Sequence, residues 1–223
     1  MEYNMTKPIV HLFKLGIEES NRHIFHQAGV HNLTTSYENE VGTLAMYSSR
    51  LKGNPGEFLV LEIYEDTEAY QTHVNSNQYK YFIDHVGKHL TKQVKYEVEP
   101  LFLKEKLSSQ QCIEPNQYLL KFAQIEIEED QQNTFEDSVL TNMEASMSEE
   151  DVLAMYALRD VNQHNKYYFY EVYQNEQAYE AHCETTHFKK YIQQTKDILN
   201  DKKLYNLEND VFITCLLYTS PSP

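Results

Sequence analysis

The chain has 223 residues, a length that suits one large domain or two domains of about 100 residues each. Its formal net charge of −15 would repel a phosphate backbone, and basic residues cluster no further than short pairs such as Lys189, Lys190, so we exclude nucleic acid as a partner. Residues 1–7 lack the pattern of a signal peptide and no apolar segment approaches the roughly 20 residues that span a membrane, so we expect a cytoplasmic protein with no membrane partner.

The chain opens with the pattern of a strand followed by a helix. Residues 9–15 alternate as a strand would, and Gly16 ends the pattern. Residues 18–36 are polar and suit a helix that buries Ile24, Ala28 and Phe25. The first two elements are therefore a strand and an amphipathic helix.

A hairpin and a second helix follow. Residues 43–50 and 58–64 predict two strands joined by the turn residues 52–56. Asp66 or Thr67 then caps a helix that passes His73 and continues or restarts through Tyr79. Residues 94–103 supply a fourth strand, so the order is strand, helix, strand, strand, helix, strand, which is the ferredoxin-like arrangement.

The same order repeats from Tyr118, so the chain is an internal duplication. Tyr47 recurs as Tyr156, an offset of 109 residues (156 − 47). The same offset relates four further pairs, which are Arg50 and Arg159, Glu62 and Glu171, Tyr64 and Tyr173, and His73 and His182. We expect repeats at residues 1–103 and 117–215 joined by a linker at residues 104–116. Residues 216–223 resemble translated cloning sequence, and we leave them out of the fold prediction.

Both faces of the third strand are apolar or aromatic, although helices should cover only one of them. We therefore predict an α+β fold in which two ferredoxin-like repeats pack their antiparallel sheets face to face as a pseudo-dimeric α+β barrel. Each pocket should lie between a sheet and its own helices. The two repeats can complete such a barrel within a monomer, and a homo-oligomer is the alternative.

The motif that carries the resemblance is clearest in the second repeat, where Leu153–Arg159 and Tyr168–Tyr173 precede Ala178, Tyr179 and His182. This pattern resembles the antibiotic biosynthesis monooxygenase (ABM) family of dimeric α+β barrel proteins, here as a tandem pair. The resemblance implies a cofactor-independent monooxygenase in which a small aromatic quinol or phenol reacts with dioxygen. Relatives that degrade haem use a tryptophan, which this chain lacks.

The resemblance also suggests roles for individual residues. His182 would be the base that deprotonates the substrate, with Glu171 or His187 orienting it or relaying the proton. Glu62 and His73 are the counterparts in the first repeat, but the sequence after His73 departs from the family pattern. If only one pocket is active, this departure favours the second. Substrate-binding candidates are the set Tyr156, Arg159, Tyr173, Phe169, Tyr47 and Tyr64.

Each assignment has a structural alternative. A helix histidine beside a sheet is commonly a core or rim residue, and the tyrosines can belong to the core with tethered hydroxyl groups. Glu171 would be costly to bury alone, so it can equally pair with Arg159 across the second hairpin.

We expect neither a metal nor a bound cofactor. His182 and His187 lie five positions apart, a spacing that does not place two ligands on one helix face, and no glycine-rich phosphate loop is present. Two other functions stay open. The same base could isomerise or degrade a small hydroxy-diketone, or the chain could be a non-catalytic barrel that binds a hydrophobic small molecule.

Overall fold

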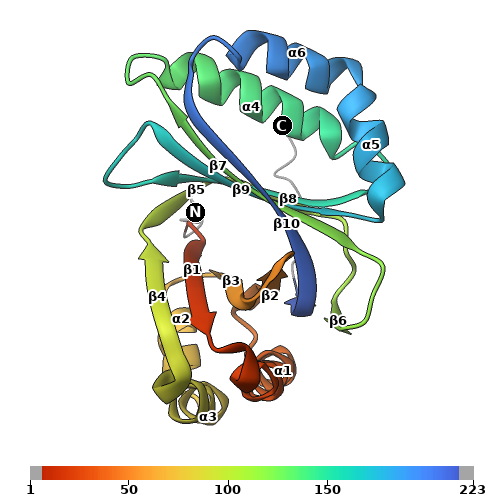
Figure 1. The fold of residues 1–223 in the computed structure, drawn as a ribbon. Helices are drawn as coiled ribbons and strands as arrows, with labels where there is room; N and C mark the ends of the chain where they lie inside the picture. Colours follow the sequence, from red (N-terminus) through yellow and green to blue (C-terminus); the bar gives the residue numbers. More distant parts are fainter. Residues whose placement is uncertain (1–6, 216–223) are drawn as a thin grey trace, which may run out of the picture. The chain divides into compact units, whose positions relative to one another are not determined.

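The computed structural model describes residues 7–215, which form two compact units (Figure 1). Of these residues, unit 1 holds 7–96, 108–116 and 209–215, and unit 2 holds 97–107 and 117–208. The tail at 216–223 lies outside the described residues. In the part of the chain that the structure describes, no helix has both the length and the apolar character needed to cross a membrane.

Unit 1 is a ferredoxin-like repeat. Its antiparallel sheet has the order β4-β1-β3-β2, which this fold requires. Its elements in chain order are β1 (Ile9–Ile17), α1 (Arg22–Asn39), β2 (Thr43–Leu51), β3 (Asn54–Tyr64), α2 (Thr67–Asn75), α3 (Asn77–Val86) and β4 (Leu90–Tyr96).

Unit 2 repeats this arrangement with the order β10-β7-β9-β8. Its helices α4 and α6 lie along one face of the sheet (Figure 1). The elements are β7 (Leu119–Ile127), α4 (Gln132–Ser146), β8 (Val152–Asp160), β9 (Lys166–Tyr173), α5 (Glu176–Glu184), α6 (Thr186–Thr195) and β10 (Leu199–Thr214). The predicted α+β class, with two ferredoxin-like repeats and antiparallel sheets, is confirmed.

The fourth strand differs from the prediction. Residues 94–103 do not form one strand, because β4 ends at Tyr96 and β5 (Val98–Glu105) begins two residues later. The break has a physical cause, since β4 pairs with β1 in unit 1 whereas β5 pairs with β8 in unit 2. Each sheet therefore gains a fifth strand.

The fifth strand of unit 1 is the last part of β10. Residues 209–214 belong to unit 1, where β10 is the neighbour of β2. A short strand, β6 (Gln110–Ile113), pairs with this part of β10 and lies within the segment expected to be a linker. The repeat boundaries drawn from the sequence stay a prediction, but strand pairing does not follow them.

Local sequence signals explain how the helices begin. The Asp66 carboxylate accepts a hydrogen bond of 2.9 Å from the Ala69 N–H and so caps α2, as predicted. The helical segment then restarts, because Ser76 caps α3 through the Tyr79 N–H. On α1, Phe25 and Ala28 are buried as predicted, whereas Ile24 is only partly buried.

Candidate functional site

Each unit contains a cavity between its sheet and its own helices, where pockets were predicted. The cavity of unit 1 has a volume of about 390 Å³, and the cavity of unit 2 has a volume of about 250 Å³. The walls of the larger cavity come from β1, α1, β3, α2, α3 and β4. Both volumes are of the order that small-molecule sites use.

One carboxyl group occupies the same place in both cavities. Glu62 on β3 lines the cavity of unit 1, and Glu171 on β9 lines the cavity of unit 2. The Tyr64 hydroxyl donates to Glu62 Oε2 at 3.0 Å, and the Tyr173 hydroxyl donates to Glu171 Oε2 at 2.9 Å. Burial raises the pKa of both carboxyls above the ordinary value. A carboxyl with a raised pKa in an apolar cavity is suited to proton transfer near neutral pH.

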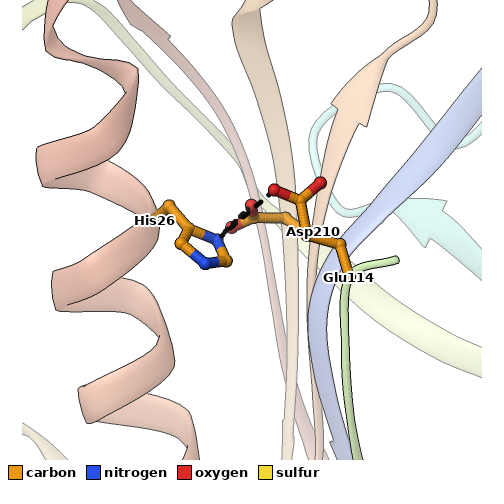
Figure 2. A group of neighbouring side chains, drawn as sticks. All are labelled: His26, Glu114 and Asp210. Carbon is orange, nitrogen blue, oxygen red and sulfur yellow. Dashed lines mark hydrogen bonds and ion pairs between the residues drawn. The ribbon is translucent and has the colours of Figure 1, made fainter. Parts of the chain in front are cut away.

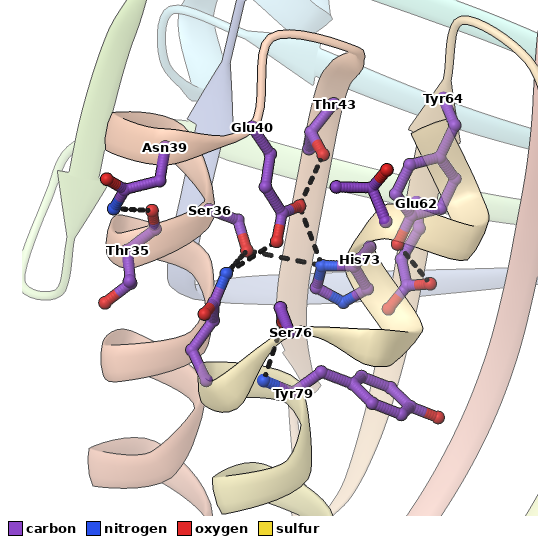
Figure 3. A network of polar contacts seen from close by, with 12 residues as sticks. Thr35, Ser36, Asn39, Glu40, Thr43, Glu62, Tyr64, His73, Ser76 and Tyr79 are labelled. Atoms are coloured by element: carbon purple, nitrogen blue, oxygen red, sulfur yellow. Dashed lines mark hydrogen bonds and ion pairs between the residues drawn. The ribbon is translucent and has the colours of Figure 1, made fainter. Parts of the chain in front are cut away.

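His73 lies behind the cavity of unit 1 and is held by a second carboxylate (Figure 3). Its side chain is fully buried, and Nδ1 lies 3.0 Å from Glu40 Oε2. Glu40 also accepts from Thr43 Oγ1 at 2.8 Å and from Gln78 Nε2 at 2.5 Å. Burial raises the pKa of Glu40, but the hydrogen bond and the charge of His73 outweigh this effect and leave the pKa below its ordinary value.

The other edge of the His73 ring faces the cavity carboxyl. Figure 3 shows Glu62 on the side of the ring away from Glu40. His73 Nε2 is buried and has no hydrogen-bond partner among residues 7–215. The charge of His73 moderates the raised pKa of Glu62, so the two groups are electrostatically coupled. Glu40, His73, Glu62 and Tyr64 therefore form one buried acid–base row.

The row recurs in unit 2 with one addition. His182 Nδ1 lies 2.8 Å from Glu149 Oε1, and His187 Nε2 lies 3.1 Å from the same oxygen. His187 Nδ1 donates to Asn142 Oδ1 at 2.8 Å. Burial lowers the pKa of His187, and the nearby Glu149 carboxylate partly offsets this effect. The structure thus brings His182 and His187 together through Glu149.

The histidines do not form the cavity walls. Neither His73 nor His182 lines the cavity of its unit, whereas Glu62 and Glu171 do. The cavity presents a carboxyl group with a histidine behind it, so a ligand in the cavity would meet the carboxyl group and not the histidine.

The alternative pairing of Glu171 with Arg159 is wrong. The hairpin register places Tyr167 opposite Arg159 and Met155 opposite Glu171, so the two charged side chains are far apart along the strands. Arg159 instead pairs with Glu99 at 2.6 Å and with Glu136 at 2.8 Å.

Of the other residues predicted to contact the substrate, one lines a cavity and others are buried in the core. Phe169 lines the cavity of unit 2. Tyr156 and Tyr47 are fully buried away from the cavity walls, where the Tyr156 hydroxyl donates to Glu105 and Tyr47 stacks on Phe212 with ring centroids 5.1 Å apart. Tyr64 and Tyr173 are not among the cavity walls, but their hydroxyl groups donate to the cavity carboxyls Glu62 and Glu171.

Sequence reasoning missed two pairs of site residues. Glu40 and Glu149 lie 109 positions apart (149 − 40), and Asn32 and Asn142 lie 110 apart (142 − 32). The offset of the first pair is the one that relates the two hairpins, and the offset of the second pair is the one that relates the first helix of each repeat. A search of the duplication for recurring polar residues would have found both.

A further polar cluster in unit 1 was also missed (Figure 2). His26 Nδ1 lies 2.8 Å from Asp210 Oδ1 and 3.9 Å from Glu114 Oε1. Such a nitrogen and oxygen set is of the type that binds divalent cations, and its ligand atoms lie within 4.8 Å of one another. However, Arg50 Nη1 lies 2.6 Å from Glu114 Oε2, so a guanidinium already supplies positive charge there. We assign this cluster as an ion-pair network that joins α1 to β10.

Comparison with known proteins places the fold and the family. A model of the family described as Antibiotic biosynthesis monooxygenase (ABM) matches residues 8–85 and 119–194. A candidate monooxygenase from Lactobacillus acidophilus NCFM is 25% identical, with 93% of this chain and 96% of that chain covered and a TM-score of 0.87. No curated protein matches.

Two further solved structures share the fold. A candidate monooxygenase from Fusobacterium nucleatum is 19% identical, with 94% of this chain and 95% of that chain covered and a TM-score of 0.86. An anthrone oxidase-like protein is 11% identical, with 96% of each chain covered and a TM-score of 0.58.

Proposed function

Because the chain belongs to the antibiotic biosynthesis monooxygenase family, whose model matches both repeats, we propose that it oxidises a small aromatic quinol or phenol with dioxygen and without a cofactor. The observation that carries the proposal is the duplicated cavity carboxyl, Glu62 and Glu171, each of which interacts electrostatically with a histidine that does not line the cavity. This arrangement places one proton acceptor in an otherwise largely apolar wall, which is what such a reaction needs.

The first step is removal of a hydroxyl proton from the substrate. Glu62 or Glu171 accepts this proton, because its raised pKa brings its affinity for protons closer to that of the donor. His73 or His182 lies behind the carboxyl, and its Nδ1 is fixed by Glu40 or Glu149. The tyrosine hydroxyl on each cavity carboxyl steadies the carboxylate form.

The substrate anion supplies the electrons for the remaining steps. An electron passes from the anion to dioxygen, and recombination of the two radicals forms a carbon–oxygen bond and a peroxide on the ring. The proton held by the carboxyl passes to the peroxide and gives a hydroperoxide. The ring carbon that bears it then loses its hydrogen as a proton while the O–O bond breaks, so that a carbonyl group forms and the hydroxide and the proton leave as water. A quinol and one dioxygen thus yield a hydroxyquinone and one water, so one oxygen atom enters the product and the other is reduced to water.

Oxygen uptake tests the proposal. The wild type is assayed with one-, two- and three-ring quinols and anthrones beside the variants Glu62→Gln, Glu171→Gln and the double variant. We expect the double variant to lose at least about 100-fold in kcat, the usual scale of a general base. Tyr156→Phe is the matched control, because it removes a buried hydroxyl away from either cavity.

Two outcomes would contradict the proposal. One is an absence of oxygen uptake by the folded wild type with every compound, which would favour a non-catalytic binding role. The other is turnover of a hydroxy-diketone under nitrogen, which would favour isomerisation or cleavage by the same carboxyl and histidine.

A further inference from the structure

Asn32 is a polar group in the cavity of unit 1 that the proposed reaction does not use. It lies on α1, lines the cavity and is 4% exposed. Its Oδ1 is buried and has no hydrogen-bond partner among residues 7–215. A buried amide without a partner costs free energy, and such groups are uncommon unless a ligand or water completes them.

The counterpart in unit 2 shows what is missing. Asn142 Oδ1 accepts a hydrogen bond of 2.8 Å from His187 Nδ1. The position that matches His187 in unit 1 is Gln78 (187 − 109). Gln78 Nε2 instead donates to Glu40 at 2.5 Å and to Ser36 at 3.3 Å, so it does not reach Asn32. The same amide is therefore satisfied in one repeat and left open in the other.

The walls of the unit 1 cavity indicate what kind of ligand could hydrogen-bond to Asn32. Aromatic rings line much of it, from Phe13, Phe25, Tyr70, Tyr79 and Phe82. Flat aromatic ligands pack well against such walls. The volume of about 390 Å³ suits a molecule of two or three fused rings.

Two of the polar residues that line this space, Glu62 and Asn32, lie on different walls. Glu62 lies on the sheet, and Asn32 lies on the helix that covers it. An amide can donate to or accept from a hydroxyl group, whereas a carboxylate accepts from one. We propose that the unit 1 cavity binds an aromatic ligand with two hydroxyl groups, one on Glu62 and the second on Asn32. This inference rests on the proposed function, since it specifies the substrate of that site and assigns it to unit 1.

Asn32 is then a residue that determines specificity, and it does not take part in proton transfer. The matching position in the cavity of unit 2 offers no free acceptor, because Asn142 Oδ1 already accepts the hydrogen bond from His187. The two repeats therefore differ in ligand, although each keeps its carboxyl and histidine.

The test measures binding under nitrogen, so that no turnover interferes. Affinities for 1,4-dihydroxynaphthalene and for 1-naphthol are measured by calorimetry with the wild type and with Asn32→Leu. We expect the wild type to prefer the diol by about tenfold, the scale of one hydrogen bond. Asn32→Leu should lower that preference to about one. Asn32→Ala serves as a second variant, and Asn142→Leu is the matched control that should keep the preference of the wild type.

The outcomes separate this inference from the proposed function. An unchanged preference in Asn32→Leu, loss of preference in Asn142→Leu, or a wild type that binds neither compound would overturn the inference. Oxygen uptake that is unaffected by Asn32→Leu would leave the proposed function standing without it. Diol binding that depends on Asn32, with no oxygen uptake, would support the inference and contradict the oxygenase.

Discussion

Replacement of the two helix asparagines by leucine should change stability in opposite ways. Leucine has the same branched arrangement of side-chain heavy atoms as asparagine, and each asparagine borders a cavity that can take the added volume of the methyl groups, so the change chiefly removes polarity. Asn142→Leu removes the acceptor of the 2.8 Å hydrogen bond from His187 and leaves that ring nitrogen, on a partly buried side chain, without it. Asn32→Leu removes an amide whose buried Oδ1 has no hydrogen-bond partner within residues 7–215.

The magnitudes follow from these contacts. Loss of one partner of a buried hydrogen bond costs about 1–3 kcal/mol, and the lower end of about 1 kcal/mol applies here because His187 is only partly buried. For a chain of this length each kcal/mol shifts Tm by about 2–4 °C, so Asn142→Leu should lower Tm by about 2–4 °C. Replacement of an unsatisfied buried polar group is close to neutral or stabilising. Asn32→Leu should therefore leave Tm unchanged or raise it by a few degrees.

Thermal unfolding of the ligand-free protein, followed by circular dichroism, measures both changes. The two variants serve as controls for each other, because they occupy matching places in the two repeats. A fall in Tm for Asn32→Leu as large as that for Asn142→Leu would mean that Asn32 has a partner within the chain. The argument for a ligand at that position would then fail.

Three further predictions concern the charged groups. Burial raises the pKa of Glu62 and Glu171 above the usual 4.5, so the folded chain binds protons at these groups more readily than the unfolded chain does. The stability that this proton binding contributes is fully present below pH 4.5 and is lost as the pH rises through the pKa of the folded state. The double replacement by glutamine should remove this loss. In denaturation experiments the double variant should therefore have a higher free energy of unfolding than the wild type at pH 7, and this difference should disappear at pH 4. An equal difference at both pH values would contradict the account. His73→Ala should lower the free energy of unfolding by about 3 kcal/mol or more, because it removes the histidine partner of the buried Glu40 carboxylate. His182→Ala should cost less, because Glu149 is more exposed and keeps His187 as a partner. Urea titrations that rank the two variants the other way would refute this reasoning. Arg159→Ala should cost about 1 kcal/mol in stability, since the ion pairs are partly exposed, and should leave oxygen uptake unchanged, so a large fall in kcat would restore Arg159 to the active site.

Much of the fold could be predicted because the signals are local and occur twice. The turn at residues 52–56, the cap at Asp66 and the offset of 109 residues between Tyr47 and Tyr156 locate the hairpins and helices of both repeats. The exchange of the outer strands could not be predicted. Residues 98–105 have the same alternating character whichever β-strand they join, so pattern alone does not choose between pairing with the first repeat and with the second.

The site was predicted in part for a similar reason. Glu62, Glu171 and both helix histidines were found because they recur beside conspicuous aromatic strands. Which of these groups lines the cavity depends on the direction of each side chain. It also depends on a third group, Glu40 or Glu149, which follows another helix and holds the histidine. Likewise, the partners of Arg159 come from β5 and α4, and no spacing in the sequence indicates that these elements meet.

The most direct test of the central claim is the fate of labelled dioxygen. The protein is incubated under oxygen-18 gas with the quinol that gives the fastest oxygen uptake, and the product is analysed by mass spectrometry. The account predicts one oxygen-18 atom in each product molecule, and it predicts that this product is lost with the Glu62→Gln, Glu171→Gln double variant. A product without the label, or one formed equally well by the double variant, would contradict it.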